Sequence, residues 1–195
     1  MTDAEVSDNE LVSRIKAGDY DAFETLVRRY HEKVHRLVFG MLQNESETEE
    51  VVQEAFLNIF RNITKFEGKS APGTWIYRIA ANASLMRLRS RRRKPLLALE
   101  DFPNAETPGS IWPTGAWADQ PDDKLLNAEL QERIQDAIAH LPEKYRMVIL
   151  LRDVEGLSNN EIADTLGLSL PTVKARIHRA RIFVRETLAK YFVGK

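Results

Sequence analysis

Apolar residues recur at three- and four-residue spacing along most of this chain, which is the spacing of one buried face of an α-helix. The longest stripe runs from Phe23 to Met41 and covers about five turns. A shorter one precedes it between Asn9 and Ala17, and others follow downstream. Because nearly every periodic segment has the helical period, the pattern predicts an all-α fold.

The stretch from Ser158 to Arg185 predicts two helices joined by a tight turn. Ser158 and Glu161 have the spacing of a capping box, in which each side chain bonds a backbone N–H of the other at a helix start. Gly167 tolerates the left-handed conformation that ends a helix, and Ser169 can cap the next one. Two helices joined in this way form a helix-turn-helix, whose second helix enters a DNA major groove.

The second helix of this pair has one apolar stripe and a cationic remainder. The stripe consists of Val173, Ile177, Ala180, Val184 and Leu188. The polar positions are Thr172, Lys174, Arg176, His178, Arg179, Arg181 and Arg185. A basic face taken alone is often just solvated. Together with the capped first helix and the short turn, it predicts DNA binding.

The overall composition excludes some classes of site but does not by itself indicate a function. The 195 residues contain 28 basic and 29 acidic ones, for a formal net charge of −1, which favours no partner. The absence of cysteine excludes disulfides and thiolate metal sites. We also find no signal peptide and no apolar run long enough to span a bilayer, and therefore expect a cytoplasmic protein without a membrane span.

One segment interrupts the helical pattern. Five of the eight prolines lie between positions 95 and 121, among glycines and acidic residues. So long a stretch without periodicity is typical of a linker. We therefore predict two small helical domains, residues 1–95 and 124–195, joined by a Pro-rich acidic linker at 96–123.

The segment from Phe66 to Lys94 combines a turn-rich loop, aromatic residues and an arginine block. We expect Thr74 to cap the helix that follows the loop. Aromatic faces that stack bases, next to cations that hold phosphates, suit single-stranded nucleic acid. The alternative is that Trp75 and Tyr77 belong to the core. For Trp75 we favour the core, because it is in step with Ile79.

Two further patterns have open interpretations. His31-Glu32-Lys33-Val34-His35 matches the H-E-x-x-H motif of zinc proteases, although we favour histidines at the edge of a packed stripe and predict no metal. Farther on, a helix carries Glu50, Gln53, Glu54 and Asn58 along one polar face, opposite a core face that includes Ile59 and Phe60. The acidic residues either compensate the helix dipole or form a docking surface for a basic partner.

Three stretches in this order resemble the extracytoplasmic-function (ECF) type of bacterial sigma factor, in the sigma-70 family. Glu50 to Phe56 is similar to the family's polymerase-binding helix. Phe66 to Gly68 with Thr74 to Asn82 is similar to its promoter-melting segment. Leu141 to Glu143, Glu161 to Ala163 and Thr172 to Arg181 are similar to its C-terminal DNA reader. The resemblance covers nearly the whole chain except the ends and the linker.

The resemblance implies a role for each matching position. Glu50, Gln53 and Glu54 would contact the clamp helices of the largest polymerase subunit, and the flap is a further expected polymerase contact. The minus-ten element would be held by Gly68, Lys69, Ser70, Asn82, Arg87 and Arg89. The minus-thirty-five element would be contacted by Thr172, Lys174, Arg176, His178 and Arg179. Glu50 and Pro171 depart from the commonest family residues, which affects contact details rather than the class.

The function implied is a sigma factor that binds core RNA polymerase and directs promoter-specific transcription initiation. Such a protein performs no chemistry and needs no cofactor. Its implied partners are core polymerase, promoter DNA and an anti-sigma factor. The alternative is a stand-alone helix-turn-helix regulator, which would not need both the aromatic loop and the arginine-rich helix in its N-terminal half.

Overall fold

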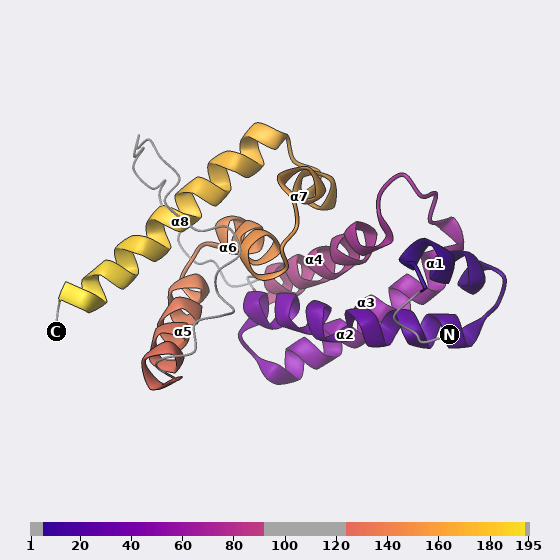
Figure 1. Ribbon diagram of the computed structural model, residues 1–195, viewed down its shortest axis with the longest axis horizontal. Coiled ribbons are helices and arrows are strands. Elements are labelled where there is room, and N and C mark those ends of the chain that lie inside the picture. The colour runs from indigo at the N-terminus through magenta and orange to yellow at the C-terminus, as the bar shows by residue number, and fades with distance from the viewer. Residues whose placement is uncertain (1–5, 92–123, 194–195) are drawn as a thin grey trace.

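The computed structural model describes residues 6–91 and 124–193, with the side chains of 124–129 and 190–193 left aside. The predicted linker, 96–123, lies outside the described residues. Within them every regular element is helical, as expected (Figure 1). The N-terminal elements are α1 (Asp8–Lys16), α2 (Tyr20–Leu42), α3 (Glu45–Asn62), the 3-10 turn η1 (Ile63–Lys65) and α4 (Pro72–Arg91). The C-terminal ones are α5 (Lys124–Ala139), α6 (Glu143–Ile149), the π-helical turn η2 (Leu150–Val154), α7 (Asn159–Leu166) and α8 (Leu170–Val193).

Short polar side chains start the N-terminal helices. Ser7, Asp19 and Asn44 each accept a hydrogen bond from the backbone N–H three residues ahead, which satisfies a donor that has no partner inside the helix. The bond from the Ala22 N–H and the contact with Arg14 lower the pKa of Asp19. These caps fix where α1, α2 and α3 begin.

The N-terminal bundle is built on α2, which packs against α1, α3 and α4. Most of its predicted stripe is buried, although Phe23 and Val27 are only partly buried, and Val34, Leu37, Val38 and Met41 are fully inaccessible. Ile59 of α3 and Ile76 of α4 complete the same core. Burial of several large side chains at about 1.5–3 kcal/mol each stabilises the bundle.

The C-terminal bundle is built on α8, which packs against α5, α6 and α7. All five positions of its predicted stripe, Val173, Ile177, Ala180, Val184 and Leu188, are buried. Leu141, Leu151 and Ile162 face them in the same core. The stripe therefore holds the helix-turn-helix together and leaves its cationic face outside.

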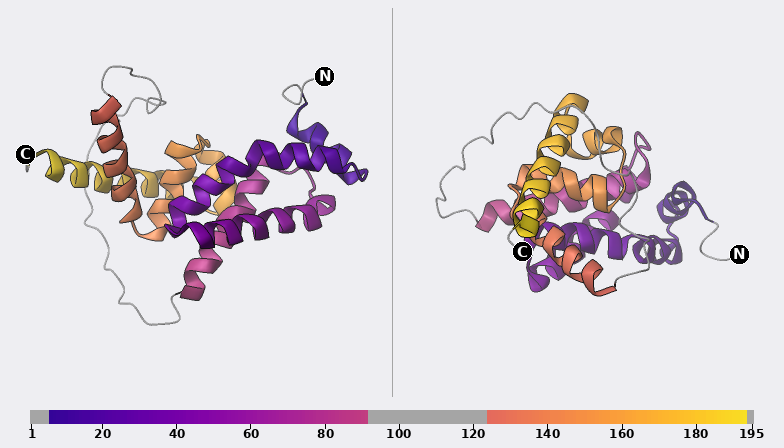
Figure 2. Two further views of the ribbon diagram at one scale, coloured as in Figure 1. Left: turned by 90° about the horizontal axis from the view of Figure 1, so that it is seen from below. Right: turned by 60° about the vertical axis from the view of Figure 1, so that its left-hand side comes forward.

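The two bundles lie against each other. Helix α4 packs on α7, and α2 packs on α5 and α6. Figure 1 shows α6 and α7 between α8 and α4, and both views of Figure 2 show the same neighbours. The sequence did not predict this contact, which joins segments that the linker separates.

One predicted helix start was wrong. Helix α4 begins at Pro72 rather than after Thr74, whose side chain is buried instead of capping the helix. Proline is favoured in the first helical turn because its missing N–H would be unbonded there in any case. Farther on, α6 passes directly into η2, which ends at Val154, and Gly156 follows in the left-handed region at φ 75°.

Candidate nucleic-acid and polymerase interface

The helix-turn-helix has the predicted geometry. The Ser158 N–H donates to Glu161 Oε2 at 2.8 Å, and the Glu161 N–H donates to Ser158 Oγ at 3.2 Å, so the capping box is complete. Gly167 ends α7 in the left-handed region at φ 64°. Ser169 Oγ lies 2.7 Å from Thr172 Oγ1 and accepts from the Thr172 N–H at 3.4 Å. The turn and the start of α8 are thus fixed by local bonds.

The five residues predicted to contact the minus-thirty-five element lie on the outer surface of α8. Lys174, His178 and Arg179 are polar positions outside the buried stripe, as are Thr172 and Arg176. Arg179 Nη1 donates to the Tyr145 hydroxyl at 3.5 Å. These side chains form a basic face beside the capped turn.

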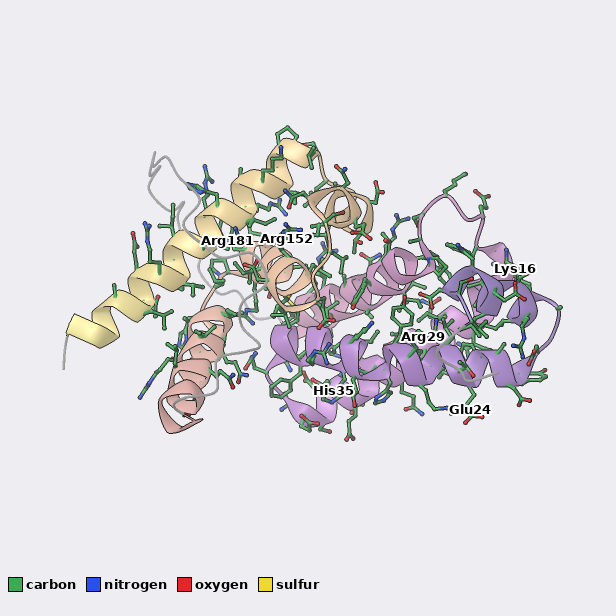
Figure 3. All side chains as sticks on the ribbon, in the orientation of Figure 1. Lys16, Glu24, Arg29, His35, Arg152 and Arg181 are labelled. Atoms are coloured by element: carbon green, nitrogen blue, oxygen red, sulfur yellow. The ribbon has the colours of Figure 1, made fainter. Side chains whose placement is uncertain are left out.

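Arg181, which the sequence placed on the same cationic surface, has a structural partner. Its Nε donates to Asp153 Oδ2 at 3.1 Å and its Nη2 to Asp153 Oδ1 at 2.5 Å. The hydrogen bonds to Asp153 raise the pKa of the Arg181 guanidinium. Arg152, next to Asp153 on η2, donates to the Leu157 carbonyl at 2.7 Å; Figure 3 labels both arginines. Arg181 therefore braces α8 against the turn before α7.

The loop between η1 and α4 is anchored at its start and open beyond. Phe66 is buried and packs on Trp75 with ring centroids 5.1 Å apart. Lys16 donates to the Phe66 carbonyl at 2.5 Å. Trp75 is partly buried against the core, as predicted. Past this anchor, the exposed Lys69 forms an ion pair with Glu67.

Gly68, Ser70 and Asn82 complete the predicted minus-ten surface. Gly68 is exposed and has φ 72°, a conformation that favours glycine, and Ser70 is half-buried. Asn82 is exposed on α4 and lines a shallow groove of about 290 Å³ between α3 and α4. The opposite wall of the groove includes Asn58, and its end includes Arg87.

Helix α3 presents the predicted polymerase-binding residues on one side. Glu50, Gln53 and Glu54 are exposed and line a second groove, of about 380 Å³, that continues to Arg61. Leu57, which the sequence analysis missed, lies in this groove and is 47% exposed.

Phe60 is a correction to the predicted core face of α3. It is 41% exposed, while the adjacent Ile59 is fully buried. Phe60 packs instead on Tyr20 and Phe23, with ring centroids 6.1 and 4.9 Å apart. Two neighbouring helical positions point about 100° apart, so a narrow core holds only one of them.

Arginines at the end of α4 bond to glutamates of α3. Arg87 donates to Glu50 from both terminal nitrogens at 2.9 Å, and Arg91 forms an ion pair with Glu47. Arg89 is exposed. The residues predicted to hold DNA and those predicted to hold polymerase are therefore in direct contact.

The two histidines of the H-E-x-x-H pattern have other neighbours. His31 stacks on Phe56 with centroids 6.0 Å apart, and His35 Nε2 lies 3.2 Å from Glu45 Oε1. Within residues 6–91 and 124–193, no group of three or more His, Asp or Glu side chains is placed to hold a metal ion. The same part of the chain contains no helix long and apolar enough to cross a membrane.

Comparison with known proteins identifies the two bundles. The family "Sigma-70 region 2" matches residues 26–94, and "Sigma-70, region 4" matches residues 131–184. The ECF RNA polymerase sigma factor SigW of Bacillus subtilis (strain 168) is 39% identical over 179 residues, which are 91% of this chain and 94% of SigW. The chain belongs to the ECF sigma factors of RNA polymerase. It directs promoter-specific transcription initiation with that polymerase and is not an enzyme.

Other relatives agree. The ECF sigma-E factor of Haemophilus influenzae is 36% identical over 188 residues, 94% of this chain and 96% of that one. The sigma-E factor of Escherichia coli (strain K12) is 38% identical over 179 residues, 91% of this chain and 92% of that one.

Two solved structures share the fold of this ECF sigma factor. CnrH in complex with the cytosolic domain of CnrY has a TM-score of 0.68 at 24% identity, over 94% of this chain and 97% of CnrH. RpoE of Bartonella quintana, in complex with the anti-sigma factor NepR, has a TM-score of 0.63 at 18% identity, over 86% of this chain and 96% of RpoE.

Proposed function

We propose that this sigma factor divides promoter reading between its two bundles. Residues 1–95 bind core polymerase and the minus-ten element, residues 124–195 bind the minus-thirty-five element, and 96–123 connect them. The observation that carries this proposal is that the acidic face of α3 and the cationic end of α4 are adjacent, exposed and opposite in charge. One small bundle thus offers a surface for a basic protein and a surface for a nucleic acid.

The polymerase-binding surface consists of Glu50, Gln53 and Glu54, with Leu57 and Phe60 beside them. Exposed apolar side chains with a charged rim are typical of protein interfaces. The occupant we propose is the pair of clamp helices of the largest polymerase subunit, and a further polymerase contact is the flap. Charge reversal at Glu54, which is exposed on α3, weakens this docking without disturbing the core.

The minus-ten surface consists of Gly68, Lys69, Ser70, Asn82, Arg87 and Arg89. An unpaired base can be read on its Watson–Crick edge only after it leaves the stack, and an exposed asparagine in a groove offers both a donor and an acceptor. The arginines hold the phosphates. The minus-thirty-five surface consists of Thr172, Lys174, Arg176, His178 and Arg179, where arginine can bond guanine with two donors.

Gel filtration of the full chain with core polymerase tests the assignment. We expect co-elution for the natural chain, loss of it for Glu54→Lys, and retention for Glu24→Lys, an exposed glutamate of α2. Transcription in vitro from a cognate promoter should follow the same order. Equal co-elution of Glu54→Lys and the natural chain would contradict the α3 surface.

We also propose that an anti-sigma factor binds this chain. Its support is the structural relative RpoE, which was solved with the anti-sigma factor NepR. The test is to purify proteins that co-elute with the tagged chain from its own cells and to add each one to the transcription assay. A partner that suppresses transcription supports the proposal, and co-eluting proteins without effect would refute it.

A further inference from the structure

Helix α1 lies against both ends of the loop that precedes α4. The loop, residues 67–71, includes positions 68–70 of the proposed minus-ten surface. It leaves η1 at Phe66 and enters α4 at Pro72. Helix α1 packs on η1 and on α4 as well as on α2, and Figure 1 shows it at the end of the bundle where the loop lies. The family match to region 2 begins only at residue 26 and does not include α1.

Helix α1 is itself firmly held on the bundle. Leu11, Val12 and Ile15, on one face of the helix, are buried. Where the chain turns from α1 into α2, Arg14 Nε donates to Asp19 Oδ2 at 2.8 Å. The residues at the two ends of α1 are therefore presented by a fixed element.

The last residue of α1 holds the start of the loop. Lys16 Nζ donates to the Phe66 carbonyl at 2.5 Å and lies 5.8 Å from the centroid of the Phe66 ring, within the range of a cation–π contact. The Phe66 ring is buried against Trp75, and the Phe66 N–H donates to the Ile63 carbonyl at 3.1 Å. Phe66 is thereby held at its N–H, its carbonyl and its ring, and the loop leaves from a fixed point.

The first residue of α1 holds the other end of the loop through Tyr30. Asp8 Oδ1 accepts from Arg29 Nη1 at 2.5 Å, and Asp8 Oδ2 accepts from the Tyr30 hydroxyl. Burial and the hydrogen bond to Asp8 raise the pKa of Tyr30, so the hydroxyl keeps its proton and remains the donor. The same hydroxyl lies against Gly73 in the first turn of α4, where a Cβ atom would be only 2.6 Å from its oxygen.

Between these two anchors the loop is open to solvent. Glu67, Gly68 and Lys69 are exposed, and Gly68 has φ 72°. A loop with free ends has many conformations and must give them up when it binds a ligand. Fixing both ends removes most of these conformations before the ligand arrives.

We propose that Lys16 is a positioning residue for the minus-ten element, and that α1 holds the loop in the shape that receives a single-stranded base. Lys16 acts through the Phe66 carbonyl and does not touch the DNA. This inference deepens the proposed minus-ten function and rests on it.

Hydrogen exchange of the full chain without polymerase tests the two anchors. The Phe66 N–H reports on the start of the loop, and the Trp75 N–H, which donates to the Ala71 carbonyl at 3.2 Å, reports on its end. Lys16→Met keeps the length of the side chain but removes the ammonium, so it should raise the exchange rate of the Phe66 N–H severalfold. Asp8→Ala should raise that of the Trp75 N–H.

The matched control is Lys65→Met, which removes the same charge from the exposed residue next to Phe66. It should leave the exchange of the Phe66 N–H at its natural rate. An unchanged rate in Lys16→Met, or an equal rise in Lys65→Met, would overturn the proposal.

DNA binding separates positioning from a direct phosphate contact. The probe is the labelled single-stranded oligonucleotide that the natural chain, assembled with core polymerase, enriches from a randomised library. Lys16→Met should weaken its binding by about two- to tenfold, because the loop must then be ordered on binding. The dependence of binding on salt should not change, since no phosphate contact is lost. Unchanged affinity, or a weaker salt dependence in Lys16→Met, would overturn the proposal.

Asn82→Ala distinguishes a failure of this inference from a failure of the proposed function. It removes a residue of the minus-ten surface and leaves both anchors in place. It should weaken binding of the same oligonucleotide while the Phe66 N–H exchanges at its natural rate. Unchanged binding in Asn82→Ala would contradict the minus-ten assignment itself, whatever Lys16→Met does to the loop.

Discussion

Arg87 donates two hydrogen bonds, both 2.9 Å long, to a single carboxylate oxygen of Glu50. Arg87 lies near the end of the helix that we assign to promoter DNA, and Glu50 lies in the first half of the helix that we assign to polymerase. The Glu50 side chain is 60% exposed and that of Arg87 is 26% exposed, so both can reach an outside partner. Polymerase and DNA would each replace one member of this pair.

Substitution of Glu50 tests whether the pair withholds Arg87 from DNA. Glu50→Gln should tighten binding of single-stranded minus-ten DNA by the free chain and weaken binding to core polymerase. An exposed ion pair is worth about 0–1 kcal/mol, so the gain should reach at most about fivefold. Fluorescence anisotropy with a labelled oligonucleotide measures it.

The control for this prediction is Glu49→Gln, which removes the same charge at the adjacent exposed position. A gain confined to Glu50→Gln identifies release of Arg87. Equal gains in both variants would mean that only net charge matters and would contradict the proposed release of Arg87 from Glu50.

Position 73 has no room for a side chain, because the Tyr30 ring lies directly against the Gly73 backbone. A Cβ atom at position 73 would lie 2.6 Å from the Tyr30 hydroxyl oxygen, which also hydrogen-bonds to Asp8. Gly73→Ala should therefore lower the free energy of unfolding by about 1–3 kcal/mol, as overpacking does. Thermal unfolding followed by circular dichroism measures this loss.

Removal of the hydroxyl should relieve the clash. Tyr30→Phe alone loses the bond to Asp8 and is destabilising, but Gly73→Ala should cost less in that background than in the natural chain. A double-mutant cycle gives the coupling. Additive effects would show that the two positions do not meet.

Gly167 should be sensitive for a different reason. A Cβ atom at this position would meet only open space, but the backbone has φ 64°, a left-handed conformation that is costly for alanine and tolerated by asparagine. Gly167→Ala should cost about 1–2 kcal/mol of stability, and Gly167→Asn should cost less. Urea unfolding measures both, and an equal loss for the two variants would point to a cause other than the backbone.

Local rules were sufficient for most helix starts and for the buried stripes. The Ser158 capping box, the Gly167 turn and the Val173 stripe follow from residue type and spacing, and the structure confirms them. Each depends on neighbours within a few residues, which a sequence displays directly.

Contacts between distant segments could not be predicted in the same way. In the sequence Glu155 looks like an ordinary turn residue. In the structure its carboxylate accepts hydrogen bonds from Arg36 and Tyr77, which are more than 70 positions away. Arg181 looked like its cationic neighbours until Asp153 was found opposite it. Phe60 is as apolar as Ile59, and only the packing of α3 decides which of them is buried.

Arg176 and Arg181 both lie on α8 among the cationic positions, but we expect them to have different roles. Arg176→Ala should weaken transcription from a cognate promoter by about 1–3 kcal/mol if the lost contact is to a base, with thermal stability unchanged. Arg181→Ala should instead lower thermal stability, because it leaves Asp153 without its two hydrogen bonds. Asp153→Ala should then resemble Arg181→Ala, while sharing nothing with Arg176→Ala. Parallel transcription and unfolding assays on the three variants decide the matter: an Arg176→Ala protein that transcribes normally would remove this residue from the promoter surface, and an Arg181→Ala protein that is fully stable but inactive would add Arg181 to it.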